Sequence, residues 1–122
     1  MRYTILYTGD DGKSYFEEKT LKMNKIDTPD GSDFGFLSNN FNASSILFGQ
    51  APQELPKHNT PTKQFVIMLS GVMEIESTTG EKRSFKEGDI LLAYDLEGDG
   101  HYTRFSGAEP YRYCAIPVEV DV

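Results

Sequence analysis

The sequence predicts an all-β domain, either a sandwich or a barrel, and two observations lead to that prediction. Turn-forming pairs such as Asp11-Gly12, Ser70-Gly71 and Asp99-Gly100 recur along the whole chain. The runs between the turns are short and rich in β-branched and aromatic residues, and no run of ten or more residues has a helical period. Many short strands at close spacing are typical of both architectures.

The length of 122 residues suits a single domain. We expect residues 1–122 to form it, with N-terminal strands in residues 1–50 packing on a core barrel in residues 51–120. The predicted strands are Arg2–Thr8, Tyr15–Lys22, Ser45–Phe48, Lys63–Ser70, Val72–Ser77, Lys82–Phe85, Asp89–Ala93, His101–Phe105 and Arg112–Val120.

The strand Gln64–Leu69 is apolar on both of its faces. Val66 and Met68 share one face, and the residues that alternate with them are equally apolar. A half-exposed strand would carry polar residues on one face, so this strand is predicted to be buried on both sides. One side then faces the interior, and the other needs a cover from the N-terminal segment or from a second subunit. We therefore expect a homodimer.

The formal net charge of −7 argues against nucleic acid and anionic membranes as partners, because both attract basic surfaces. No apolar run reaches the roughly 20 residues of a membrane-spanning helix, and the residues after Met1 lack the features of a signal peptide. The single cysteine, Cys114, cannot form an internal disulfide. It predicts a buried, inert thiol and a cytoplasmic protein.

Two segments carry polar residues at regular spacing. In the first, His58 is followed by Thr60, then by Gln64, and after six further residues by Gly71. This spacing resembles the first motif of the cupin superfamily, which reads His-x-His, then Glu, then Gly. Thr60 stands at the position of the second His, and Gln64 stands at the position of the Glu.

The second segment begins at Gly88, includes His101 and ends at Phe105. It resembles the second cupin motif, with Leu96 where Pro is usual and Phe105 where Asn is usual. A closer resemblance is to a group of small bacterial cupin-domain proteins. They share a His-Asn-x-Pro segment, a Gln-Phe-Val-Ile-x-Leu-Ser-Gly strand and turn, and a late Gly-x-Gly-His-x-Thr-Arg segment. This chain carries all three, beginning at His58, Gln64 and Gly98.

The resemblance implies a double-stranded β-helix, the cupin or jelly-roll barrel, with a pocket for a small-molecule ligand. Isomerases, lyases and dioxygenases all occur on this fold, so an enzyme acting on a small polar metabolite is expected. The stretch Lys63–Gly71 is also similar to a strand in nucleotide-sugar ketoisomerases, which use pocket histidines without an essential redox metal. A non-catalytic module that binds a small ligand is the alternative, and an assembly role with a vestigial pocket is a third.

The resemblance places His58, Gln64 and His101 together near the mouth of the pocket. As metal ligands they form a poor set, because Gln64 is neutral and Thr60 is a weak ligand. They predict at most a weakly bound divalent ion, either Fe, Mn, Ni or Zn. In the metal-free alternative, His58 and His101 are the catalytic acid and base, and Gln64 and Thr60 bind the substrate.

Tyr102 and Arg104 are further candidates for substrate binding, as a proton donor and as a bidentate partner for a carboxylate or phosphate. On an extended strand, however, they share the face opposite to His101 and Thr103. If His101 points inward, an outward salt bridge or a subunit contact is the expected role of Arg104.

Three further expectations concern the surroundings of the pocket. The acidic stretch Asp95–Glu97–Asp99 is expected to be solvated surface, with cation binding as the alternative. The prolines around His58 predict an irregular lip rather than a strand. Four upstream aromatic residues are expected to line or cover the cavity: Phe34, Phe36, Phe41 and Phe48.

Overall fold

The computed structural model describes residues 1–121, within which the chain forms thirteen strands and no helix. The all-β prediction is therefore confirmed, and no helix in this range is suited to crossing a membrane. The strands are β1 (Arg2–Thr8), β2 (Ser14–Thr20), β3 (Met23–Asp27), β4 (Asp33–Ser38), β5 (Asn42–Ala43), β6 (Leu47–Ala51), β7 (Glu54–His58), β8 (Gln64–Ser70), β9 (Val72–Ser77), β10 (Lys82–Phe85), β11 (Ile90–Tyr94), β12 (His101–Ser106) and β13 (Tyr111–Glu119).

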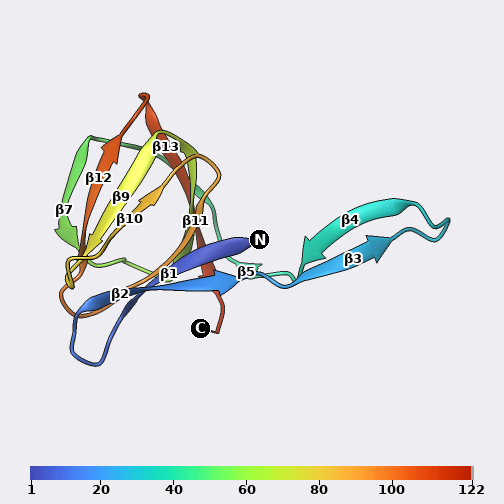
Figure 1. The fold of residues 1–122 in the computed structure, drawn as a ribbon, viewed down its shortest axis with the longest axis horizontal. Coiled ribbons are helices and arrows are strands. Elements are labelled where there is room, and N and C mark those ends of the chain that lie inside the picture. The colour runs from blue at the N-terminus through green and yellow to red at the C-terminus, as the bar shows by residue number, and fades with distance from the viewer. Residues whose placement is uncertain (122) are drawn as a thin grey trace.

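Two sheets face each other and make up the body of the molecule (Figure 1). The larger has the order β2-β1-β11-β8-β13-β5, and β6 also pairs with β13. The smaller has the order β10-β9-β12-β7. The β1–β11 pair is parallel, whereas the neighbouring pairs are antiparallel. The arrangement is that of a β-sandwich.

The main core lies between these two sheets. It is built from side chains that alternate inward along the strands, among them Leu6, Met68, Ile75 and Leu91, each at most 2% exposed. Burial of one such side chain contributes roughly 1.5–3 kcal/mol. Strand β12 shows the alternation most clearly, since its first, third and fifth residues are buried and the others are exposed. The inward parity predicted for His101 and Thr103 is therefore confirmed.

The two-sided burial predicted for β8 holds over only part of that strand. Val66 and Met68 face the core, and Phe65 is buried on the opposite face. Tyr3 and Phe41 cover Phe65 in T-shaped contacts, with ring centroids at 5.7 and 5.1 Å. Towards the end of the strand this cover stops, and Leu69 is 41% exposed.

The irregular lip predicted around His58 is wrong for Glu54–His58, which forms strand β7. This strand lies at the edge of the smaller sheet and pairs only with β12 among the described strands. Proline is tolerated on an edge strand because a missing N–H there leaves no partner unpaired. Pro56 therefore does not interrupt the strand.

The expectation that the upstream aromatic residues line the cavity is also wrong. Phe34 and Phe36 lie on a separate hairpin, β3–β4, which extends away from the body (Figure 1). They are 67% and 60% exposed, and Phe48 on β6 is 74% exposed. Only Phe41 is partly buried, and it packs on the outer face of the larger sheet rather than on the cavity.

The core assignment is tested by Ile75→Ala, which removes a side chain that is 2% exposed. Loss of its buried contacts is expected to lower the free energy of unfolding by about 2–5 kcal/mol. Leu96→Ala, at a loop residue that is 41% exposed, is the matched control and should change it by less than about 0.5 kcal/mol. Urea denaturation followed by circular dichroism measures both. Equal midpoints for the two variants would contradict the core described.

Candidate functional site

A cavity of about 100 Å³ lies between the two sheets and is bordered by His58, Gln64 and His101. The three residues that the sequence predicted to converge therefore share one cavity. Apolar side chains supply most of the remaining wall. The other lining residues are Leu55, Thr60, Pro61, Val66, Met73, Ile75, Leu91, Ala93, Thr103, Phe105 and Tyr113.

The register of β7 and β12 brings the two histidines side by side. His101 opens β12 and lies opposite His58, the last residue of β7. Their ring centroids are 4.7 Å apart, and the rings are inclined at 56°. His101 is only 4% exposed, whereas His58 is half-buried at the cavity's edge. One imidazole is thus held inside the protein, and the other lies closer to solvent.

Behind His101 lies a fully buried carboxylate. Asp95 has no exposed surface, and its Oδ2 lies 2.5 Å from His101 Nδ1. Thr60 Oγ1 donates a hydrogen bond of 2.6 Å to the other oxygen, Oδ1. A buried carboxylate is costly unless it is paired and hydrogen-bonded. Both oxygens meet that requirement here, so Asp95, Thr60 and His101 form one polar unit, which we call the Asp95 triad.

The expectation that Asp95 belongs to a solvated acidic surface is therefore wrong, although Glu97 and Asp99 are exposed as predicted. Strand parity was the signal that could have identified it. Leu91 and Ala93 point into the core, and Asp95 is the next residue on the same side. The acidic residues near Asp95 in the sequence obscured this continued alternation, because they are typical of a solvated surface.

The hydrogen bonds fix which nitrogen of each imidazole carries the proton. A carbonyl oxygen only accepts, so His58 Nδ1, at 2.8 Å from Pro56 O, must be the donor. His101 Nδ1 donates to the carboxylate of Asp95 in the same way. In the neutral form of both rings, Nε2 therefore carries the free lone pair, and both rings line the cavity.

The loop between β11 and β12 is tied closely to the end of β7. The Asn59 side-chain amide donates to the carbonyls of Asp95, Glu97 and Gly98 at 3.2, 2.9 and 3.3 Å. Gly100 has a φ of +77°, and a Cβ atom there would lie 2.6 Å from His58 O. Glycine is thus required at this position by both its conformation and its close approach to His58.

Tyr102 and Arg104 do not border the cavity. Arg104 is exposed, and its Nε donates a hydrogen bond of 2.9 Å to Glu54 on β7. That bond raises the pKa of Arg104 above its ordinary value. Tyr102 is 42% exposed, with the Lys57 ammonium 5.9 Å from its ring centroid. Both side chains lie on the outer face of the smaller sheet.

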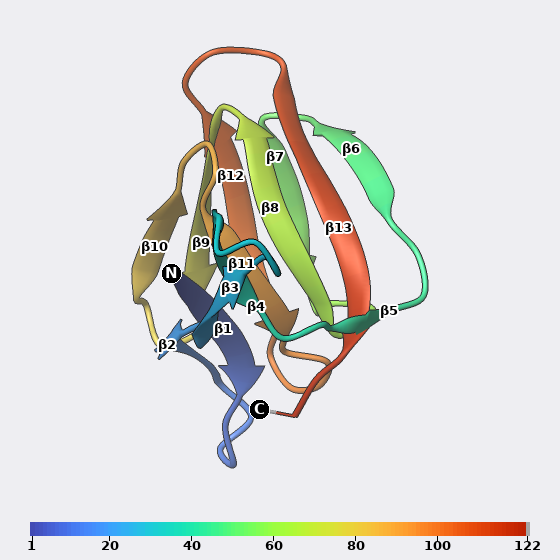
Figure 2. The same cartoon turned by 90° about the vertical axis from the view of Figure 1, so that its right-hand side faces the viewer.

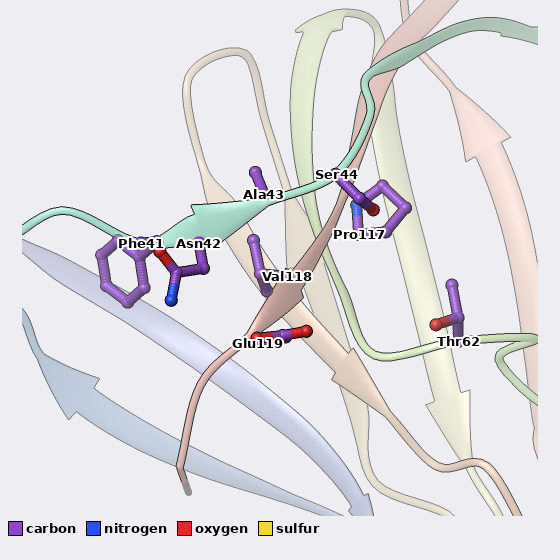
Figure 3. Close-up of a pocket in the computed structure, with 8 residues that line it drawn as sticks. All are labelled: Phe41, Asn42, Ala43, Ser44, Thr62, Pro117, Val118 and Glu119. Atoms are coloured by element: carbon purple, nitrogen blue, oxygen red, sulfur yellow. The ribbon is translucent and has the colours of Figure 1, made fainter.

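A larger hollow, of about 530 Å³, lies elsewhere, between β5 and the end of β13 (Figure 3). Glu119 is the one titratable residue on its wall, and none of the predicted site residues borders it. Its volume alone does not indicate a binding or catalytic function. The smaller cavity at the histidines is therefore the better candidate for a functional site, because polar groups converge there.

The side chains that line the small cavity can be compared with the ligands that metal ions require. Within residues 1–121, no three His, Cys, Asp or Glu side chains are grouped as a metal site. Both Asp95 oxygens are already engaged with His101 and Thr60. What remains is two imidazole nitrogens and the neutral amide of Gln64, which does not fit a tightly held transition metal.

Comparisons with known proteins add no family assignment. No model of a known protein family matches the chain, and no curated protein matches it significantly.

The role of Gly100 is tested by Gly100→Ala with Gly80→Ala as the matched control. Both glycines have positive φ, but a Cβ at Gly80 would meet nothing within 4 Å. Gly80→Ala is expected to lower the free energy of unfolding by roughly 1–2 kcal/mol, from backbone strain alone. Gly100→Ala should lower it by at least about 3 kcal/mol, because the His58 carbonyl must also move. If urea denaturation gives equal losses for both, the tight contact between the loop and β7 is refuted.

Proposed function

We propose that this chain is a cupin-type protein, with its two sheets closed into a double-stranded β-helix, and that it catalyses proton transfer on a small polar metabolite. The reaction classes that suit this site best are isomerisation and lyase chemistry. The facing sheets and the spacing of the two sequence motifs support the fold. The lone buried thiol, Cys114, supports a cytoplasmic location.

The observation that carries the proposal is the Asp95 triad at the cavity wall. The carboxylate holds His101 with its proton on Nδ1, so Nε2 is the basic atom. When Nε2 takes a proton from a substrate carbon or hydroxyl, the adjacent Asp95 carboxylate stabilises the imidazolium. Groups placed in this way typically accelerate proton transfer by about 10²–10⁴-fold.

His58 provides a second proton-transfer group. Its ring lies 4.7 Å from that of His101, so the two imidazoles can act on neighbouring atoms of one small molecule. One removes a proton while the other, when protonated, donates to an adjacent oxygen. The combined result is a shift of a double bond, which is the chemistry of an isomerase. Gln64 borders the same cavity and supplies an amide that binds a carbonyl or hydroxyl group.

The size of the cavity restricts the substrate. Its volume of about 100 Å³ is below the roughly 300–1,000 Å³ of pockets for drug-sized ligands. A metabolite of three or four carbons therefore suits it better than a nucleotide sugar. No step of the proposed reaction passes through a metal, because two imidazoles and an amide would hold a divalent ion such as Fe, Mn, Ni or Zn only weakly.

A non-catalytic small-ligand-binding module is the second candidate. The mainly apolar wall of the cavity favours it, since such a wall binds a ligand without acting on it. In that case His58 and His101 would only orient the ligand.

Hydrogen–deuterium exchange separates the two candidates. The wild-type protein is incubated in D₂O with dihydroxyacetone, glyceraldehyde or pyruvate, and deuterium entering the carbon next to the carbonyl is followed by proton NMR. We expect catalysed exchange on at least one probe. His101→Ala and Asp95→Asn should each slow it at least about 100-fold, because the first removes the base and the second removes the carboxylate that orients it and stabilises the imidazolium.

Arg104→Ala is the matched control, since Arg104 lies on the outer face, and it should exchange at the wild-type rate. Retention of exchange in His101→Ala would contradict the proposed base. Probe binding without exchange would favour the non-catalytic module instead. Titration with Zn²⁺ or Mn²⁺ should show only weak binding, and a tightly held stoichiometric ion would require a different reading of the site.

A further inference from the structure

The hairpin β3–β4, which we call the arm (residues 23–38), has almost no support from its own chain. The main contacts of its two strands are with each other. Figure 1 shows it projecting well beyond the body. An isolated two-stranded hairpin is at best marginally stable in water. The arm therefore needs a surface to pack on, and the rest of residues 1–121 does not provide one.

The arm exposes its apolar side chains. Phe34, Phe36 and Leu37 on β4 are 67%, 60% and 53% exposed. A solvated loop would expose polar residues instead, so these side chains are suited to a buried interface.

A second apolar surface lies on the same side of the molecule. On the outer face of the larger sheet, Phe48 on β6 and Ile67 on β8 flank the buried Cys114 on β13 in one row of paired residues. Phe48 is 74% exposed and Leu69, on the same face, is 41% exposed. Phe41 covers only the part of the face around Phe65. Figure 2, which looks from the side of the arm, shows β8 and β13 of this sheet facing the viewer.

We propose that these two surfaces meet in a symmetric dimer, in which the outer faces of the larger sheets pack together and each arm reaches across the partner. Because arm and face project in the same direction on one chain, a twofold axis brings each arm to the other chain's face. One arrangement thus covers both surfaces. It also supplies the missing cover for the outer side of β8.

The exposed apolar area of one chain is sufficient for a dimer interface. A fully exposed large side chain offers roughly 200 Å², so Phe34, Phe36, Leu37, Phe48 and Leu69, at their exposed fractions, present on the order of 600 Å² of apolar surface per chain. Roughly 60% of an interface is apolar, so this apolar area is enough for an interface of ordinary size. A stable interface buries about 800 Å² per partner. A second copy of this chain is therefore a sufficient occupant for the surface.

Sedimentation velocity of the full chain at micromolar concentration tests the oligomeric state. We expect a dimer for the wild type. Leu37→Asp on the arm and Phe48→Asp on the sheet should each raise the dissociation constant at least about tenfold, with the β-rich circular dichroism spectrum retained. Leu96→Asp is the matched control, since Leu96 is similarly exposed but lies in the loop after β11, and it should remain dimeric. A monomeric wild type, or arm variants that stay dimeric, would overturn the proposal.

The exchange of arms has its own test, which does not depend on a variant. Isotopically light and heavy chains are mixed by reversible unfolding and treated with a lysine cross-linker. Lys25, which is exposed on the arm, should link to lysines of the other chain's body, giving light–heavy peptide pairs. If Lys25 links only within one chain, the arm folds back on its own body and the exchange is disproved.

Discussion

The buried hydrogen bond between Asp95 and His101 is the constraint on which the site depends. A carboxylate with no exposed surface is tolerated only when its oxygens are satisfied, because removing one partner of such a pair typically costs about 3–5 kcal/mol. Thr60 must therefore donate to the second oxygen, which fixes the chain just after β7. His101 is fixed in turn at the start of β12. The need of the Asp95 carboxylate for hydrogen-bond partners thus fixes the ends of β7 and β11 and the start of β12 relative to one another.

The same constraint explains the surrounding glycines and amides. For Asp95 to reach His101, the loop between β11 and β12 must turn sharply and approach β7. Gly100 makes that approach possible, since a side chain there would meet the His58 carbonyl, and Asn59 holds the loop through three carbonyls. The Nδ1 atoms of the two histidines take up the bonds to Asp95 and to the Pro56 carbonyl, so neither of these partners occupies the Nε2 atoms. The structural support and the proposed chemistry therefore share the same residues.

The sequence predicted much of this arrangement but not all of it. The resemblance to the two cupin motifs predicted that His58, Gln64 and His101 would converge, and strand alternation predicted that Arg104 would face away from His101. Asp95 was missed because its acidic neighbours are typical of surface, whereas its parity with Leu91 and Ala93 places it inside. The arm was missed for a different physical reason. Strand prediction from a single chain relies on a buried face, and the arm buries none within its own chain, so its aromatic residues were assigned to the cavity.

The central claim is that Asp95 holds His101 with the proton on Nδ1 and a free lone pair on Nε2. Nitrogen-15 NMR of the two imidazoles tests it most directly, because protonated and unprotonated ring nitrogens have well-separated chemical shifts. At a pH where the rings are neutral, the wild type should show Nδ1–H and bare Nε2 for both histidines, and Asp95→Asn should disturb this pattern at His101 but not at His58. A wild-type His101 with its proton on Nε2 would contradict the account.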